Sequence, residues 1–399
     1  MKTRPFTLSF TQQEPISETA IAAAVSVLRS GRLHRYNVVE GELSQAALLE
    51  REFAAFQASR YCLACASGGY ALQLALRAIE LAAGEYVLTN AFTLAPVPGA
   101  IVAAGGRPLL VETTADLTPD LDDLERKALA SKARVLLLSH MRGHMPDMGA
   151  VMALVSRHGL VLIEDCAHTM GASWAGRKSG TFGHLACFST QTYKHLNSGE
   201  GGLLTTDDDT LAARATVMSG SYMIYERHGT VPALPAIEDV RLRMPNLSGR
   251  MDNLRAAILR PQLEELDRNV ERWNERYAVL AERLGACNAV HMPQRPRQER
   301  YVGSSIQFLV PDMDAAQASA FVAACAGQGV ELKWFGRGEP LAFTSTHHHW
   351  QFVEDQSLPQ TDRILAGLFD MRIPLTFSPA DCAHIADIIL DAIAGRENA

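Results

Sequence analysis

The sequence predicts an α/β fold with a large domain, whose mostly parallel mixed sheet is covered by helices, and a smaller α+β domain. Two observations support this prediction. Short apolar runs alternate with amphipathic helical segments through about the first 245 residues, a pattern typical of βαβ units with strands buried on both faces. After this point the pattern changes to one long helical segment followed by mixed strands and helices.

Local signals define the elements of the large domain in order. Residues 16–30 and 49–60 carry apolar residues at helical spacing, and Gly31 ends the first of these segments. The segment 61–84 changes from an apolar run through a Gly pair to a helical pattern. The other apolar runs, which we expect to be strands, lie at 107–114, 133–140, 160–168 and 185–189, and a helix is expected between the middle two at 148–159.

Further elements follow toward the carboxyl end. Residues 209–217 are expected to be helical, whereas 220–249 lack periodicity and are expected to be a loop. A long helix is expected over 251–285, with a kink or break at Pro261. The last part predicts strands at 305–311 and 330–335 and helices at 315–329 and 382–395.

The expected domains are therefore an N-terminal arm at 1–15, a large domain at 16–245 and a small domain at 246–399 that the long helix enters. The N-terminal helical segment is expected to belong either to the large domain or to the small one. A chain of 399 residues is long enough for two or three domains with a sizeable core.

Composition and charge exclude several classes of protein. Hydrophobic residues make up 47% and charged residues 20%, which is ordinary globular usage. The net charge is −7 and no basic run stands out, so no nucleic-acid partner is expected. The apolar runs are too short to span a bilayer and the first ten residues contain no long apolar stretch. We therefore expect a cytoplasmic protein with no membrane anchor and no signal peptide.

The seven cysteines are scattered through the chain. Cys62 and Cys65 form a single CxxC pair inside an apolar run, without the second pair or the His residues that a zinc site needs. The run His347-His348-His349 also invites a metal interpretation, but no Cys or carboxylate cluster accompanies it in the sequence. We expect buried thiols in a reducing compartment and no metal site.

Three polar groups follow apolar strands in the large domain. Asp165 ends one strand, Lys194 lies just after another, and Ser67 with the Gly pair lies between a strand and a helix. Open α/β sheets bind ligands at the carboxyl ends of their strands. A carboxylate, an amine and a helix N-terminus suit pyridoxal 5'-phosphate, because lysine forms a Schiff base with its aldehyde, an acid keeps its ring nitrogen protonated, and amides hold its phosphate.

Residues 163–208, IEDCAHTMGASWAGRKSGTFGHLACFSTQTYKHLNSGEGGLLTTDD, resemble the core of the DegT/DnrJ/EryC1/StrS aminotransferases. The resemblance extends from about residue 14 to residue 285 and is strongest over 133–208. It implies a fold-type-I enzyme that uses pyridoxal phosphate, with pyridoxamine phosphate as an intermediate. It also implies a homodimer, Glu or Gln as amino donor, and a keto-sugar or keto-cyclitol acceptor that is free or nucleotide-linked.

Within this resemblance, four residues match cofactor positions directly. Lys194 matches the Schiff-base lysine and the catalytic base, and Asp165 matches the acid that pairs with the ring nitrogen. Ser189 matches a hydroxyl that binds the phosphate. His168 falls near the phenolic oxygen of the cofactor, where Gln is more usual and where enzymes of aminocyclitols and aminohydroxybenzoate have His.

Other cofactor positions depart from the family pattern. Gly68 and Gly69 fall where Gly-Thr is usual, so Ser67 or the backbone amides must hold more of the phosphate. The aromatic residue that stacks on the ring falls at Leu94, so either Phe92 stacks instead or the ring lies between aliphatic groups.

The junction between the domains contributes two more matches. Ser248 aligns with the Asn that the family lends to the phosphate of the neighbouring subunit, and Arg250 matches a junction arginine that is expected to meet an acidic group. Specificity is expected in 220–248 and 333–352, where the family match is weakest. The candidate substrate-binding residues are His140, Tyr222, Arg227, Arg250 and His347.

Simpler structural roles compete with several of these assignments. Asp165 alone would suit a helix N-cap, the Gly pair alone a tight turn, and His168 a buried core histidine. For the whole protein, a lyase of the aminohydroxybenzoate-synthase type and a non-catalytic regulatory member stay as alternatives to the aminotransferase.

Overall fold

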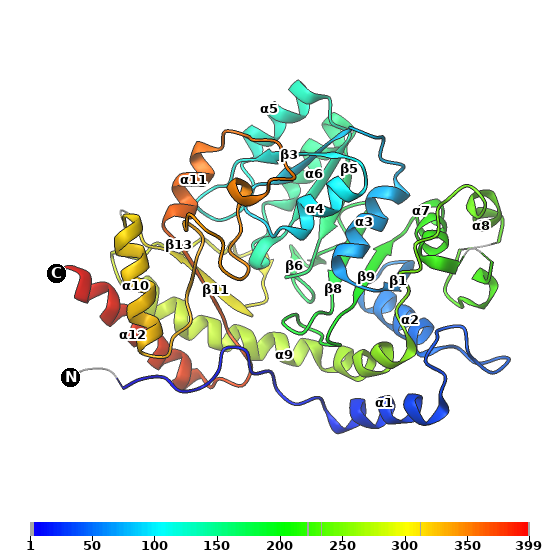
Figure 1. The fold of residues 1–399 in the computed structure, drawn as a ribbon, viewed down its shortest axis with the longest axis horizontal. Coiled ribbons are helices and arrows are strands. Elements are labelled where there is room, and N and C mark those ends of the chain that lie inside the picture. The colour runs from blue at the N-terminus through cyan, green and yellow to red at the C-terminus, as the bar shows by residue number, and fades with distance from the viewer. Residues whose placement is uncertain (1–3, 222, 233, 312, 398–399) are drawn as a thin grey trace.

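A central sheet of seven strands forms the core of the protein (Figure 1), which is described by a computed structural model covering residues 4–397 except 222, 233 and 312. The strand order is β1-β9-β8-β5-β4-β2-β3. Strand β9 runs antiparallel to both its neighbours, and the other adjacent pairs are parallel. This confirms the predicted α/β class with a mostly parallel mixed sheet. The strands are β1 (Tyr61–Cys65), β2 (Tyr86–Asn90), β3 (Arg107–Val111), β4 (Val135–Ser139), β5 (Val161–Asp165), β8 (Leu185–Ser189) and β9 (Gly202–Thr206).

Helices cover both faces of this sheet. Alternate residues of each strand point to opposite faces, so Leu137 packs in one apolar cluster with α3, α4 and α7, while Leu136 and Leu138 pack in another with α2, α5, α6 and α9. These helices are α2 (Gln45–Gln57), α3 (Gly68–Ala78), α4 (Pro96–Ala103), α5 (Leu121–Ser131), α6 (Met148–His158), α7 (Asp209–Thr216) and α9 (Asn253–Gly285).

A second, antiparallel sheet with the order β11-β13-β12 has an apolar cluster of its own. Phe308 and Phe369 lie in this cluster together with Phe6 and Phe10 of the N-terminal segment. The elements are β11 (Ser305–Leu309), β12 (Lys333–Trp334), β13 (Leu368–Arg372), α10 (Ala315–Gly327), α11 (Pro359–Ala366) and α12 (Pro379–Glu397). A short sheet, β10-β6-β7, completes the strands and comprises β10 (Glu299–Arg300), β6 (Ser173–Trp174) and β7 (Arg177–Lys178).

Helix α9 connects the two apolar clusters. Its first part, with Leu259 and Leu266, packs under the large sheet, and its last part, with Leu280 and Leu284, packs with the small sheet. The helix continues through Pro261, so of the expected kink or break the break is wrong, and the kink stays a prediction. Burial of the residues on either side outweighs the one backbone hydrogen bond that proline removes. Helix α1 (Glu18–Ser30) lies alongside α9 at the bottom of Figure 1.

The segment 220–249, expected to be a loop, contains regular structure. It includes the short turns η2 (Val217–Ser221) and η3 (Tyr225–Arg227) and the helix α8 (Leu234–Val240). Ile237 and Val240 are buried in a cluster with Ala213 of α7. Tertiary packing stabilises this helix. Because the helix has only one or two turns, it contains too few residues for its periodicity to be recognised in the sequence.

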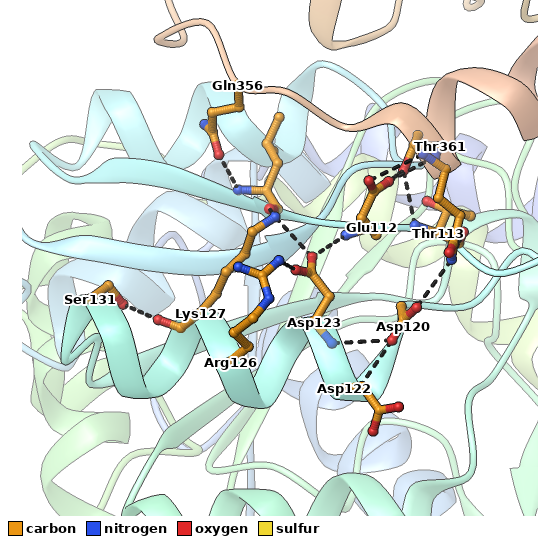
Figure 2. A network of polar contacts seen from close by, with 12 residues as sticks. Glu112, Thr113, Asp120, Asp122, Asp123, Arg126, Lys127, Ser131, Gln356 and Thr361 are labelled. Carbon is orange, nitrogen blue, oxygen red and sulfur yellow. Dashed lines mark hydrogen bonds and ion pairs between the residues drawn. The ribbon is translucent and has the colours of Figure 1, made fainter.

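The edge strand β3 is covered by a chain segment from the other end of the sequence, as Figure 2 shows. Gln356 accepts a hydrogen bond from the Leu110 amide (2.9 Å) and donates one to the Pro108 carbonyl (3.0 Å). Glu112 accepts hydrogen bonds from the amide and hydroxyl of Thr361 at 2.7 and 2.6 Å. These contacts pair backbone groups that an open edge would expose, and they anchor the segment after β12 beside the large sheet.

All seven cysteines are free thiols, and six of them are buried. Among the described residues, no helix combines the length and the apolar character that crossing a bilayer requires.

Candidate active site

A cavity of about 630 Å³ lies at the carboxyl ends of β4, β5 and β8, between the large sheet and the small one. Its wall combines the N-terminus of α3, the turn between β8 and β9, and residues that follow β13. This is the place where open α/β sheets bind ligands. The predicted cofactor residues that line it are Ser67, Gly68, Gly69, Leu94, Asp165, His168, Ser189 and Lys194.

Lys194 lies in the irregular turn between β8 and β9, where its amide donates to the Gln191 carbonyl at 2.8 Å. Its Nζ is 2.8 Å from Nε2 of His168. Burial, and after it the charge of Arg142, lowers the pKa of Lys194 to about 7. Much of the amine is therefore neutral near pH 7, as a nucleophile or general base needs to be.

The contacts of His168 fix which ring nitrogen carries its proton. Nδ1 accepts a hydrogen bond from the backbone amide of Arg142 at 3.3 Å. The neutral ring therefore carries its proton on Nε2, which donates to the lone pair of the Lys194 amine. Burial and the neighbouring Lys194 hold the pKa of His168 well below its ordinary value, so the ring is neutral. The pair thus consists of a neutral imidazole donor and a neutral amine acceptor.

Asp165 ends β5 and is held by donors on both carboxylate oxygens. Oδ1 accepts from the Ala167 amide at 3.1 Å, and Oδ2 accepts from the Ser139 hydroxyl at 2.8 Å. Ser139 in turn accepts from the hydroxyl of Thr93 at 2.9 Å. This chain of hydrogen bonds orients an acid that faces the cavity and can pair with a protonated ring nitrogen.

The N-terminus of α3 lies directly against the end of β8. A Cβ on Gly68 would lie 2.8 Å from Cβ of Ser189, so this close approach requires glycine. Ser67 caps the helix by accepting from the Tyr70 amide at 3.1 Å. The positive end of the helix and the Ser189 hydroxyl therefore share one corner of the cavity, a combination that binds phosphate.

These groups together fit pyridoxal phosphate. The glycine-lined corner suits its phosphate, the oriented carboxylate of Asp165 suits its ring nitrogen, and the low-pKa amine of Lys194 suits its aldehyde. Leu94 lines the cavity, whereas Phe92 lies in an apolar cluster and packs edge to face on Phe335 at 5.2 Å.

Three other candidates lie near the start of α9 and in the segment before it. Ser248 is exposed and has a φ of 50°, and its amide donates a hydrogen bond to Oδ1 of Asn246 at 3.1 Å. Arg250 donates to the Gly220 carbonyl at 2.6 Å and so holds the turn that precedes α8. Arg227 is exposed at the end of η3.

The remaining candidates are His140, Tyr222 and His347. His140 is fully buried with Nε2 3.1 Å from Glu164 Oε2, and Tyr222 lies outside the described residues. Nε2 of His347 and of His348 lie 3.3 and 2.7 Å from Asp362 Oδ1. The fold therefore brings the carboxylate of Asp362 to the histidine run, which corrects the expectation that no carboxylate accompanies it. Asp362 belongs to α11, which follows the run later in the sequence.

Several residues of the cavity wall were missed by the sequence reasoning. They are Thr93, Ser139, Met141, Arg142, Tyr193, Trp273 and Arg372, among others. Ser139 was detectable, because it ends an apolar strand just as Asp165 does. Arg142 and Arg372 were not detectable in the sequence, because only the approach of the small sheet to β4 brings these two cations together.

Comparison with protein families gives one match that covers nearly the whole chain. The model of the DegT/DnrJ/EryC1/StrS aminotransferase family matches residues 15–390. The match extends beyond residue 285, where the resemblance in the sequence became weak.

Three curated proteins illustrate the range of relatives. A pleiotropic regulatory protein of Geobacillus stearothermophilus is 31% identical over 68% of this chain and 70% of its own length. A dTDP-3-amino-3,4,6-trideoxy-alpha-D-glucose transaminase of Streptomyces venezuelae is 35% identical over 65% of this chain and 62% of its own length. A 3-amino-5-hydroxybenzoate synthase of Amycolatopsis mediterranei is 29% identical over 86% and 88%. The chain thus spans less than two thirds of the transaminase.

A solved structure shares the fold over almost the full length. The structure of a 3-amino-5-hydroxybenzoic acid synthase superposes with a TM-score of 0.83 and 23% identity, and covers 98% of this chain and 100% of that one.

Proposed function

The chain belongs to the DegT/DnrJ/EryC1/StrS family of aminotransferases, and on this premise we propose that it moves an amino group from Glu or Gln to a keto-sugar or keto-cyclitol. The transaminase from Streptomyces venezuelae, with a sugar in its name, supports a sugar-like acceptor. The observation that carries the proposal is the 2.8 Å contact between Lys194 and His168 in one cavity with Asp165 and the N-terminus of α3.

Pyridoxal phosphate, when bound, supplies an aldehyde for the amino group and a protonated ring that withdraws electrons from the carbon that loses a proton. The chain's own residues hold the reacting groups around it. The N-terminus of α3 and Ser189 would hold the phosphate, and Asp165, oriented by Ser139, would keep the proton on the ring nitrogen.

Amino transfer moves a proton from the carbon that bears the donor's amino group to the aldehyde carbon of the cofactor. Lys194 would carry this proton. Its pKa of about 7 lets Nζ both accept and release a proton near neutral pH. The Nε2–H of His168 would keep the lone pair of Nζ aligned whenever the amine is free.

The test compares Lys194→Gln with Lys132→Gln, a control at an exposed lysine that ends α5. Both proteins are titrated with pyridoxal phosphate, reduced with borohydride and analysed by mass spectrometry of their peptides. In the control protein we expect cofactor absorbance that changes when Glu or Gln is added, and a covalent adduct on Lys194. A wild-type protein that takes up no cofactor, or an adduct at another lysine, would refute the proposal.

A homodimer is part of the proposal. Ser248 is exposed and held in a left-handed conformation, which suits a group that reaches a neighbouring subunit better than its own cavity. Sedimentation at several protein concentrations, read together with activity, tests this. A monomer with full activity would contradict it.

A second candidate is a lyase of the aminohydroxybenzoate-synthase type. The buried His168 beside Lys194, together with the match to 3-amino-5-hydroxybenzoate synthase over 88% of that protein, favours it. Loss of water from a substrate in the absence of any amino donor would support the lyase over the aminotransferase.

A regulatory role is the third candidate, as the name of one relative indicates. A neutral buried amine with an oriented acid favours catalysis, because both cost stability if they do nothing. Single-turnover assays with Glu and with Gln distinguish the two, since a purely regulatory protein would not release a keto acid.

A further inference from the structure

One wall of the cavity gathers positive charge. Arg142 comes from the turn η1 (Met141–Gly143) that follows β4, and Arg372 ends β13. Both line the cavity, and Lys333 of β12 is close enough for its charge to act on Lys194. After burial, the charges of all three cations contribute to the lowered pKa of Lys194, opposed by Asp165.

Arg142 is buried, with 6% of its surface exposed, and its pairing is incomplete. Its Nη2 lies 2.8 Å from Asp370 Oδ2, which makes an ion pair. Among the described residues, however, neither its Nε nor its Nη2 has a hydrogen-bond partner of suitable geometry. A buried guanidinium normally satisfies its donors, so this one has capacity left for a ligand.

Arg372 is held by rings rather than by acids. Its guanidinium carbon lies 3.6 Å from the centre of the Tyr193 ring and 5.5 Å from that of Phe343. No carboxylate of the described residues lies within ion-pairing distance of it. Burial and then the charge of Arg142 lower its pKa, and together they outweigh the opposing effects of Tyr193 and Asp370. A guanidinium stacked by its face leaves its N–H edge open for hydrogen bonds in the plane.

Asp370 alone does not balance these cations. It forms ion pairs with Arg142 and, at 3.7 Å, with Lys333, and its Oδ1 already accepts from Gln307 Nε2 at 2.7 Å. Three cations therefore lie near one carboxylate, whose Oδ2 makes both ion pairs but, among the described residues, accepts no hydrogen bond of suitable geometry. The excess positive charge lies beside the reacting amine, and an anionic ligand would relieve it.

We propose that Arg142 and Arg372 form a subsite that binds a carboxylate of a substrate. The proposal deepens the proposed function and rests on this cavity being the place of amino transfer. Guanidinium groups bind carboxylates through paired, charge-assisted hydrogen bonds. The charges of both arginines act on Lys194, so the carboxylate that they bind lies close to the substrate carbon at which the amino group is transferred. Its source is either the α-carboxylate of the amino donor or an acidic group on the acceptor.

The first experiment measures binding without turnover. Glutarate, a dicarboxylate with the carbon chain of Glu and no amine, is titrated by calorimetry into the cofactor-loaded enzyme. We expect Arg372→Gln and Arg142→Gln each to weaken its binding by about tenfold or more. The matched control Arg51→Gln, at an exposed arginine of α2, and the neutral ligand glutaramide should show no such dependence. Unchanged glutarate affinity in Arg372→Gln would overturn the proposal.

Arg142→Gln also breaks the ion pair with Asp370 and so tests folding as well as binding. Arg372 has no such pair, and its variant therefore keeps the test decisive even if Arg142→Gln unfolds. Thermal unfolding of each variant separates the two effects. A structural role alone would lower the melting temperature and leave glutarate affinity unchanged, which counts against the subsite.

The two sources are separated by the half-reactions. If the donor supplies the carboxylate, Arg372→Gln raises KM for Glu in the first half-reaction with a smaller change in kcat. If the acceptor supplies it, the first half-reaction is unchanged and the variant loses activity with acidic acceptors only. Glutarate binding that depends on Arg372 in a protein without aminotransferase activity would support the subsite and refute the proposed function, so the two failures are distinguishable.

Discussion

Two buried polar clusters of this protein differ in how their charges are balanced. In the first, Arg35 and Glu50 form a bidentate pair at 2.7 and 2.9 Å, and His228 Nε2 lies 3.0 Å from Arg35. Glu50 also accepts from the Ala64 amide at 2.8 Å. In the second, the cavity, the described residues leave cations in excess and place an uncharged amine next to an uncharged imidazole. Burial alone therefore does not distinguish a structural cluster from a site.

The pKa values follow the same division. Burial raises the pKa of Glu50, but the charges and hydrogen bonds of Arg35 and His228 together outweigh burial and hold the pKa well below its usual value. Burial and then the charge of Arg142 lower the pKa of Lys194 to about 7, and the opposing charge of Asp165 does not restore it. The cluster of Arg35, Glu50 and His228 stabilises its charged groups, whereas the cavity keeps its amine reactive at a cost in stability.

The largest expected effect concerns the first cluster, that of Arg35, Glu50 and His228. Glu50→Gln leaves the fully buried Arg35 without its counter-charge, and we expect a loss of about 3–5 kcal/mol in the free energy of unfolding. Urea denaturation at pH 7 measures it. The control is Glu52→Gln on the same helix, whose partly exposed pair with Arg260 should contribute at most about 1 kcal/mol. Equal losses in the two variants would contradict the comparison.

The second effect has the opposite sign. Lys194→Met removes a buried amine with a pKa of about 7 in the folded state and an ordinary value of 10.5. We expect the cofactor-free variant to be more stable than the wild type by about 3 kcal/mol at pH 8, since about 2.5 of the 3.5 units between the two pKa values still count at this pH. Chemical denaturation of both proteins measures the difference.

The pH dependence gives this prediction a further check. Between pH 7 and 10.5 the unfolded lysine binds the proton that the folded lysine has lost, so wild-type stability rises with pH over this window. The advantage of Lys194→Met should therefore shrink as the pH rises and vanish near 10.5. An advantage that does not depend on pH would mean that packing, rather than desolvation of the amine, explains it.

The smallest effect concerns the orientation of Asp165. Ser139→Ala removes a donor to its carboxylate and interrupts the chain from Thr93, and we expect kcat to fall about tenfold with a stability change of about 1 kcal/mol. Steady-state kinetics and thermal unfolding measure the two quantities. Ser131→Ala, at the end of α5, where the hydroxyl donates only to the Lys127 carbonyl of the same helix, is the control that should leave kcat unchanged. A large loss of stability without a loss of kcat would assign Ser139 to the fold alone.

Local patterns predicted the parts of the fold that depend on local chemistry. The apolar runs that became β1, β3, β4, β5 and β8 were evident, because strands buried on both faces need continuous apolar residues. Helix α8 and the unbroken course of α9 through Pro261 were not, because packing of distant residues decides both.

The sequence by itself determined the chemistry of the proposed cofactor site. Asp165 ends β5, Ser189 ends β8 and Lys194 follows β8, and these two parallel neighbours place their carboxyl ends at one edge of the sheet. The tertiary structure alone decided what surrounds that chemistry. The tautomer of His168 and the hydrogen bond from Ser139 depend on contacts between the ends of β4 and β5, which only the paired strands bring together. The presence of Arg142 and Arg372 in one cavity wall depends on the small sheet lying against the large one. No local pattern encodes such contacts, because they join segments that are separated in sequence.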